Sequence, residues 1–159
     1  MNVELDGQAP TPEAQLQAWM ARLDAKTQKL ALAVRASLRK RLPTANELAY
    51  DYTDSVVISY SPTDKGIAGV LALKAGVAGV ALYFNQGPEL PDPKGLLQGK
   101  AKQTRFIAVE AAAQLDDPDV QALIGAAVGQ AKIPLPAEGQ GRLINMSGAA
   151  AAKKKPRRP

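Results

Sequence analysis

The chain has 159 residues, no cysteine and no histidine. These absences exclude disulfides, thiolate catalysis and cysteine-based zinc sites, and they remove the usual general base near neutral pH and the commonest metal ligand. The formal net charge of +5 is local, because the tail KKKPRRP carries five cations while residues 1–152 balance 15 basic against 15 acidic residues.

This length is typical of one domain. We expect residues 1–10 to be flexible, residues 11–147 to form the domain, and residues 148–159 to be a disordered basic tail. The start MNVELDGQAP has no apolar run of the kind that signal peptides contain. The lack of cysteine suits a reducing compartment, so we expect a cytoplasmic protein.

The first predicted element is a helix in TPEAQLQAWMARL. Thr11 is a suitable N-cap, and Pro12 fits the first helical position. One face of this helix is apolar, with the 3.6-residue period of an amphipathic helix. The apolar face consists of Leu16, Trp19, Met20 and Leu23.

A second helix is predicted from Asp24, a suitable N-cap, to Pro43, which ends it. Apolar residues recur every four positions, at Leu30, Val34, Leu38 and Leu42. We expect the basic residues to occupy other faces or the last turn, where cations suit the helix dipole. These basic residues are Arg35, Arg39, Lys40 and Arg41.

A run of strands follows, beginning with ELAYDYT and SVVISYS. Residues 66–84 approach the length of a membrane span, but Lys74 lies at their centre and Ala75-Gly76 is a turn signal. We therefore predict a β-hairpin there rather than a transmembrane segment. An irregular connection then leads to a strand at residues 104–110.

The clearest helix signal is LDDPDVQALIGAAVGQA, with Asp117 as N-cap and Pro118 at the first helical position. Beyond it, RLINM (residues 142–146) predicts one short edge strand. Strands joined by short turns and flanked by helices indicate an α+β fold. We expect N-terminal helices, an antiparallel sheet of about five to six strands, and a C-terminal helix packed on the same face.

The segment ELPDPKGLLQGKAKQTRFIAVE, followed by DPDVQALIGAAV, resembles the second half of the YdhG-like domain, a family of unknown function. The resemblance covers residues 12–132. It implies a frataxin-like fold, in which helices back one face of a sheet. The matching positions are Leu90, Asp92, Pro93, Leu96, Leu97, Gly99, Lys102, Arg105 and Phe106.

One function proposed within that family is intracellular iron chaperoning, which in frataxin relies on a ridge of clustered carboxylates. Here the acidic residues are dispersed, apart from Asp116, Asp117 and Asp119, which a helix start already explains. Iron handling is therefore an alternative function, and we predict no metal-ligating residue and no cofactor.

The connection before the residue 104–110 strand is the main candidate ligand site. GLLQGKA has three residues between its glycines and no Ser or Thr after the lysine, so it is not a P-loop. Its cations could still meet an anion. The candidate ligand-binding residues are Asp92, Lys94, Lys100, Lys102, Arg105 and Tyr60.

A structural interpretation of the same connection competes with that one. The lysines would solvate an exposed loop that Leu96 and Leu97 hold to the core. Arg105 would then pair with Asp92 or Glu89 and fix the loop against the sheet.

Glu47 and Asp51 share the face parity of one strand, so a shared carboxylate site is a further hypothesis beside the commoner one of solvated strand residues. The tail could contact phosphates of nucleic acid in a salt-dependent, sequence-independent way, or simply keep the chain soluble. The candidate nucleic-acid residues are Lys153, Lys154, Lys155, Arg157 and Arg158.

Together these features predict a small cytosolic ligand- or partner-binding domain, with an anionic ligand among the candidates. Its binding groove would lie between the sheet and residues 92–105. Frataxin-like iron or metal chaperoning and a nucleic-acid accessory role through the tail are the alternatives. Enzymatic activity is not favoured without histidine or cysteine, although carboxylate chemistry stays open.

Overall fold

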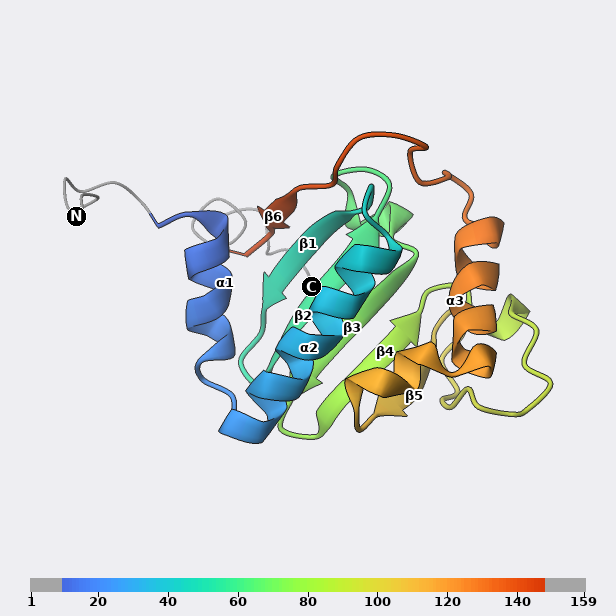
Figure 1. Cartoon of the computed structure of the whole chain (residues 1–159), viewed down its shortest axis with the longest axis horizontal. Coiled ribbons are helices and arrows are strands. Elements are labelled where there is room, and N and C mark those ends of the chain that lie inside the picture. Colours follow the sequence, from blue (N-terminus) through green and yellow to red (C-terminus); the bar gives the residue numbers. More distant parts are fainter. Residues whose placement is uncertain (1–9, 148–159) are drawn as a thin grey trace.

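The computed structural model describes residues 10–147 (Figure 1). The expected flexible start, apart from Pro10, and the five candidate nucleic-acid residues of the tail lie outside this range. The helices are α1 (Pro12–Met20), α2 (Ala25–Arg41) and α3 (Pro118–Gln130), with short 3-10 helices η2 (Gly66–Ala68), η3 (Gly87–Glu89) and η4 (Ala112–Asp116). The strands are β1 (Asn46–Asp51), β2 (Ser55–Ser61), β3 (Leu71–Gly76), β4 (Gly79–Phe84), β5 (Arg105–Val109) and β6 (Leu143–Asn145).

The six strands form one sheet in the order β5-β4-β3-β2-β1-β6. Neighbouring strands from β1 to β5 are antiparallel, whereas β6 runs parallel to β1 at the edge. The sheet is mixed because β6 arrives by a crossover from α3 rather than by a hairpin. The predicted α+β class and the short edge strand at residues 142–146 are both confirmed.

The strand register separates the two faces of the sheet, since residues paired across strands point to the same side. One face carries the apolar core, and Figure 1 shows α2 lying over it, with α1 beside β6 and α3 on the side of β5. The buried apolar side chains of this face are Ala49, Val56, Ile58, Tyr60, Leu71, Leu73, Ala75, Val80, Leu82, Phe84, Ile107 and Val109.

Local sequence explains where each helix starts. The side chain of Thr11 accepts a hydrogen bond from the Ala14 amide, and that of Asp24 accepts one from Thr27. At α3, the Asp117 carboxylate accepts from the Asp119 amide. Each cap satisfies an N–H that the first turn of a helix leaves without a partner, so the three predicted N-caps are confirmed.

Residues 66–84 contain the predicted hairpin, formed by β3 and β4. Gly79, the first residue of β4 after the turn at residues 77–78, has φ +106°, a conformation that side-chain-bearing residues rarely adopt. Within residues 10–147, no helix is long and apolar enough to cross a membrane.

Candidate functional site

The most unusual feature of the core is a buried arginine. Arg35 of α2 is only 5% exposed, and Glu47 of β1 is 4% exposed. The buried residues of α2 are Ala31, Val34, Arg35 and Leu38. The expectation that Arg35 occupies another face is therefore wrong, because this i, i+3, i+4, i+7 stripe includes it.

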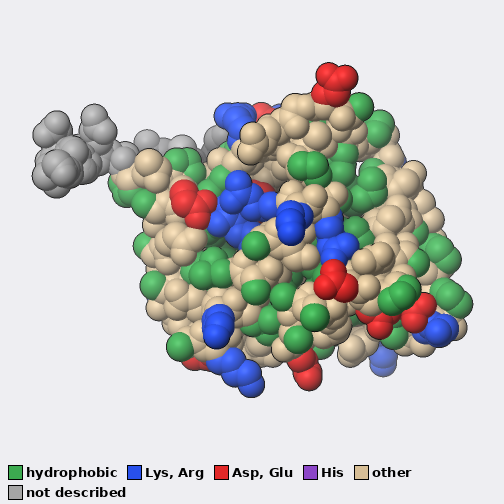
Figure 2. All heavy atoms as spheres, in the orientation of Figure 1, with side chains coloured by type: hydrophobic (Ala, Val, Ile, Leu, Met, Phe, Trp, Pro, Cys, Tyr) green, Lys and Arg blue, Asp and Glu red, His purple; other side chains and the backbone are tan. Residues whose placement is uncertain are grey.

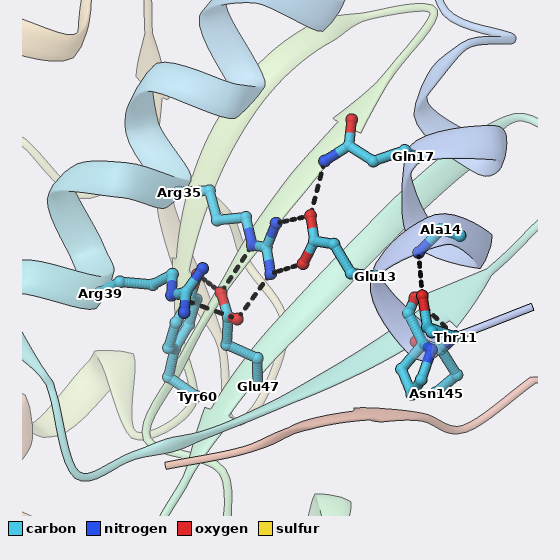
Figure 3. Close-up of polar contacts among 10 residues, drawn as sticks. Thr11, Glu13, Ala14, Gln17, Arg35, Arg39, Glu47, Tyr60 and Asn145 are labelled. Atoms are coloured by element: carbon cyan, nitrogen blue, oxygen red, sulfur yellow. Dashed lines mark hydrogen bonds and ion pairs between the residues drawn. The ribbon is translucent and has the colours of Figure 1, made fainter. Parts of the chain in front are cut away.

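Arg35 stays charged in the interior because carboxylates from two other elements surround it (Figure 3). Its Nε and Nη2 donate to the two carboxylate oxygens of Glu47, both at 2.9 Å. Its Nη1 and Nη2 donate to the two carboxylate oxygens of Glu13 in α1, at 2.8 and 2.9 Å. One guanidinium thus joins α1, α2 and β1 through two bidentate pairs.

Two more side chains complete this cluster around Glu47. The Tyr60 hydroxyl in β2 donates to a Glu47 oxygen at 2.8 Å, and the Arg39 Nε lies 3.8 Å from the other oxygen. Figure 3 shows Arg39 and Tyr60 on the side of Glu47 away from Glu13.

The electrostatics follow from these contacts. Hydrogen bonds from Arg35 lower the pKa of Glu13 to about 2, against the opposing effect of burial. Burial works against the charge on Arg35, but hydrogen bonds to Glu13 and Glu47 outweigh it and raise its pKa. Burial, together with the Glu47 charge, raises the pKa of Tyr60 well above its ordinary value, so its hydroxyl remains a donor.

A hollow of about 550 Å³ opens beside this cluster, and we call it the arginine hollow. Its polar lining comes from Arg39, Lys40, Glu47 and Tyr60, and its apolar lining from Ala36, Leu42, Pro43 and Ala45, with residues 139–141 completing the wall. Figure 2 shows lysine and arginine side chains gathered over the C-terminal half of α2, on the face that carries this hollow.

The wall formed by residues 139–141 is fixed to the sheet. The Gly141 amide donates to the Pro43 carbonyl at 2.9 Å, and the Glu47 amide donates to the Arg142 carbonyl at 2.8 Å. A Cβ on Gly141 would lie 1.7 Å from the Ala45 carbonyl oxygen, so only glycine permits this approach. The hollow is therefore preformed, as ligand sites usually are.

The sequence-predicted carboxylate site is not formed. Glu47 is bound by Arg35 and Tyr60, whereas Asp51 pairs with Arg22. Tyr60, the one predicted ligand-binding residue outside the loop, lines the arginine hollow.

The predicted loop residues lie apart from this hollow. The Asp92 carboxylate accepts from the Leu96 and Leu97 amides at 2.8 and 2.9 Å. Lys94 lies 3.4 Å from Asp119, and Lys100 and Lys102 are exposed. The space bordered by Asp92 and Lys94 measures about 30 Å³, which is roughly the volume of one water molecule.

The expected pairing of Arg105 with Asp92 or Glu89 is wrong. Its guanidinium donates to the backbone carbonyls of Ala101 and Thr104, so the side chain folds back over its own approach to β5. Both bonds come from Nη1, and the Asp92 carboxylate already accepts hydrogen bonds from two amides.

Sequence reasoning missed Glu13, Arg35, Arg39 and Lys40 as parts of a site. The available signal was the position of Arg35 on the helix. It lies four residues after Ala31 and four before Arg39, so the three side chains point to the same side of α2. An arginine within the buried stripe of a helix requires a carboxylate partner, and that requirement points to an acidic residue on the facing strand.

The described residues contain no group of three or more histidine, cysteine, aspartate or glutamate side chains placed to hold a metal ion. The three aspartates near α3 have separate partners. Asp116 pairs with Arg41, Asp117 caps α3, and Asp119 pairs with Lys94.

No protein-family model, curated protein or solved structure matches the chain. The YdhG-like resemblance therefore stays a prediction.

Proposed function

We propose that the chain is a cytoplasmic binding domain that takes a small organic anion in the arginine hollow. The observation that carries the proposal is the charge of the hollow's lining. Arg39 and Lys40 supply two cations, and Glu47 is the one carboxylate among the lining residues. Glu47 already accepts hydrogen bonds from Arg35 and Tyr60, so its charge is largely compensated.

The form of the hollow supports a ligand with an organic body. Ala36, Leu42, Pro43 and Ala45 give apolar contact, while the two cations lie on the last turns of α2. A phosphate or carboxylate group could accept hydrogen bonds from Arg39, whose side chain is 52% exposed and whose Nε is 3.8 Å from Glu47. A small apolar group would then rest against the alanine, leucine and proline side chains.

The other candidate sites have less support. Along the loop of residues 92–105, Lys94 is opposite Asp119, and the nearby space holds about one water. Iron chaperoning lacks a carboxylate cluster within residues 10–147. A nucleic-acid role through the tail concerns residues outside the described range. The proposal that the chain is YdhG-like rests on the sequence resemblance of residues 89–110 and 117–128.

Calorimetric titration with phenyl phosphate tests the proposal, with benzyl alcohol as a neutral probe of similar body. We expect saturable binding of phenyl phosphate and no saturable binding of benzyl alcohol. Because hydrogen bonds to charged groups are lost, Arg39→Gln with Lys40→Gln should weaken binding by about tenfold or more.

The matched control removes two cations from the loop, as Lys94→Gln with Lys100→Gln. It should change the affinity by less than about twofold, because exposed distant charges are screened. If the loop variant loses binding and the Arg39/Lys40 variant retains it, the anion site is in the loop and the proposal is wrong.

A further inference from the structure

A second hollow lies on the side of the molecule where α3 ends. It measures about 630 Å³ and shares no lining residue with the arginine hollow. We call it the α3 groove. Its lining residues come from residues 66–70 around η2, from residues 85–86 after β4, from residues 103–104 before β5, from Ala127 in α3, and from residues 131–133 directly after α3.

Hydrogen bonds join three of the segments that line the α3 groove. The Asn85 amide donates to the Val70 carbonyl at 3.2 Å, and the Gly87 amide donates to the Gln103 carbonyl at 3.1 Å. The Asn85 side chain donates from Nδ2 to the Gly69 carbonyl, so its orientation is also set. The part of the groove formed by residues 69–70, 85–87 and 103 is thus held together by hydrogen bonds.

The polar groups of the α3 groove are mostly uncharged. Asn85, Gln86, Gln103 and Thr104 line it, and Lys132 is the single charged residue in the lining. Amide side chains offer N–H donors and a carbonyl acceptor, and a hydroxyl offers both. This set matches an amide group of a ligand, which also presents one donor and one acceptor.

The apolar part of the groove is exposed to an unusual degree. Residues 10–147 contain four large hydrophobic side chains that are exposed, and two of them, Ile67 at 95% and Ile133 at 50%, line this groove. They come from η2 and from the segment after α3, so they belong to different walls. Burying side chains of this size favours association.

We infer that the α3 groove binds an uncharged ligand with a branched apolar body and an amide group. The apolar body contacts Ile67 and Ile133, and the amide group exchanges hydrogen bonds with Asn85 and Gln103. Lys132 is the single cation in this lining, whereas Arg39 and Lys40 together line the arginine hollow, so we assign the anion to that hollow and an uncharged ligand to the α3 groove. This site is separate from the proposed anion site, although Gln103 and Thr104 belong to the connection that the sequence favoured for ligand binding.

N-acetylleucinamide is a suitable probe, because it combines a branched apolar body with two amide groups and no charge. N-acetylleucine is its matched partner, with a carboxylate in place of the terminal amide. Titration followed by amide NMR signals should give saturable shifts at Asn85, Gln103, Thr104 and Ile133. N-acetylleucinamide should bind at least as tightly as N-acetylleucine.

Variants of exposed side chains then test the site without disturbing the core. Ile67→Ser with Ile133→Ser should weaken N-acetylleucinamide binding by about tenfold or more, because two apolar contacts are lost. Val77→Ser is the matched control, since Val77 is 87% exposed and lies in the β3–β4 turn away from the groove. That control, and Lys132→Gln, should each change the affinity by less than about twofold.

Three outcomes would overturn the inference: no saturable shift at the groove, equal binding by the Ile67/Ile133 variant, or tighter binding of N-acetylleucine that Lys132→Gln removes. The last would identify an anion site instead. Arg39→Gln with Lys40→Gln should leave N-acetylleucinamide binding unchanged, so failure of this inference is distinguishable from failure of the proposed anion site.

Discussion

Arg35 of α2 and Glu47 of β1 form a buried ion pair with two hydrogen bonds of 2.9 Å. Both residues are at most 5% exposed. The pair compensates the one carboxylate that lines the arginine hollow, and it positions that carboxylate against Tyr60. The stability of the fold and the charge of the candidate site therefore depend on the same contact.

Arg35→Met should lower the free energy of unfolding by about 3–5 kcal/mol, because it leaves the buried Glu47 without its charge partner. Urea denaturation measures this change. Arg39→Met is the matched control and should cost less than about 1 kcal/mol, since its contact is long and half-exposed. Adding Glu47→Leu to Arg35→Met should recover part of the loss. Equal costs for Arg35→Met and Arg39→Met would contradict the assignment of Arg35 as the buried partner.

Stability should fall in acid through Glu13. Its pKa is about 2 in the folded chain and 4.5 as the ordinary value, so the unfolded chain binds the proton more tightly. The contribution of Glu13 to the free energy of unfolding is therefore fully present above pH 4.5 and is lost as the pH falls toward 2. Because half of its side chain is exposed, solvent screening reduces the effect below what the shift alone implies.

Glu13→Gln should flatten the dependence of the unfolding midpoint on pH in this window, measured by thermal denaturation between pH 2 and 7. Glu110→Gln, which changes an exposed carboxylate beyond β5, should leave the dependence as in the parent chain. Identical profiles for Glu13→Gln and the parent would show that the Arg35 contact does not hold Glu13 ionised.

We expect Asp92 to stabilise the conformation of residues 92–97 rather than to bind a ligand. Asp92→Ala removes the acceptor of the Leu96 and Leu97 amides, which should lower local stability by about 1–3 kcal/mol. Hydrogen exchange should therefore become faster at these two amides, while phenyl phosphate affinity stays unchanged. Glu89→Ala, at an exposed carboxylate of the same connection, is the control and should change neither quantity. Loss of phenyl phosphate binding in Asp92→Ala would contradict this role and would indicate that the loop belongs to the anion site.

Two glycines should respond in opposite ways to the same substitution. A Cβ on Gly87 would lie 2.5 Å from the Arg105 backbone nitrogen, so Gly87→Ala should destabilise the fold by about 1–3 kcal/mol. Gly125 lies inside α3 with open space around its Cβ position, so Gly125→Ala should stabilise by up to about 1 kcal/mol. Thermal denaturation of both variants checks the contrast, and a stable Gly87→Ala would argue against the packing of η3 on β5.

Local features of this fold could be predicted from the sequence, because their causes lie within a few residues. Thr11, Asp24 and Asp117 each cap a helix whose first turn follows directly. The β3–β4 hairpin was signalled by Ala75-Gly76, although these two residues end β3 and the turn itself lies at residues 77–78.

The candidate site could not be predicted in the same way. Glu13, Arg35 and Glu47 come from three elements, and their meeting depends on how α2 is rotated over the sheet. The sequence predicts another face for Arg35 because a charge usually indicates exposure, whereas the ion pairs with Glu13 and Glu47 stabilise the buried guanidinium. The parallel pairing of β6 with β1 could not be predicted either, since the sequence of a three-residue strand carries no information about its direction in a sheet.

The most direct test of the anion site is amide NMR mapping of phenyl phosphate on the isotopically labelled chain. The proposal predicts saturable shifts at Gly139, Gln140 and Gly141 and at the Arg39 side-chain N–H, which line the arginine hollow. Signals of residues 92–105 should stay in place. Shifts confined to residues 92–105, or no saturable shift in the arginine hollow, would contradict the proposed function.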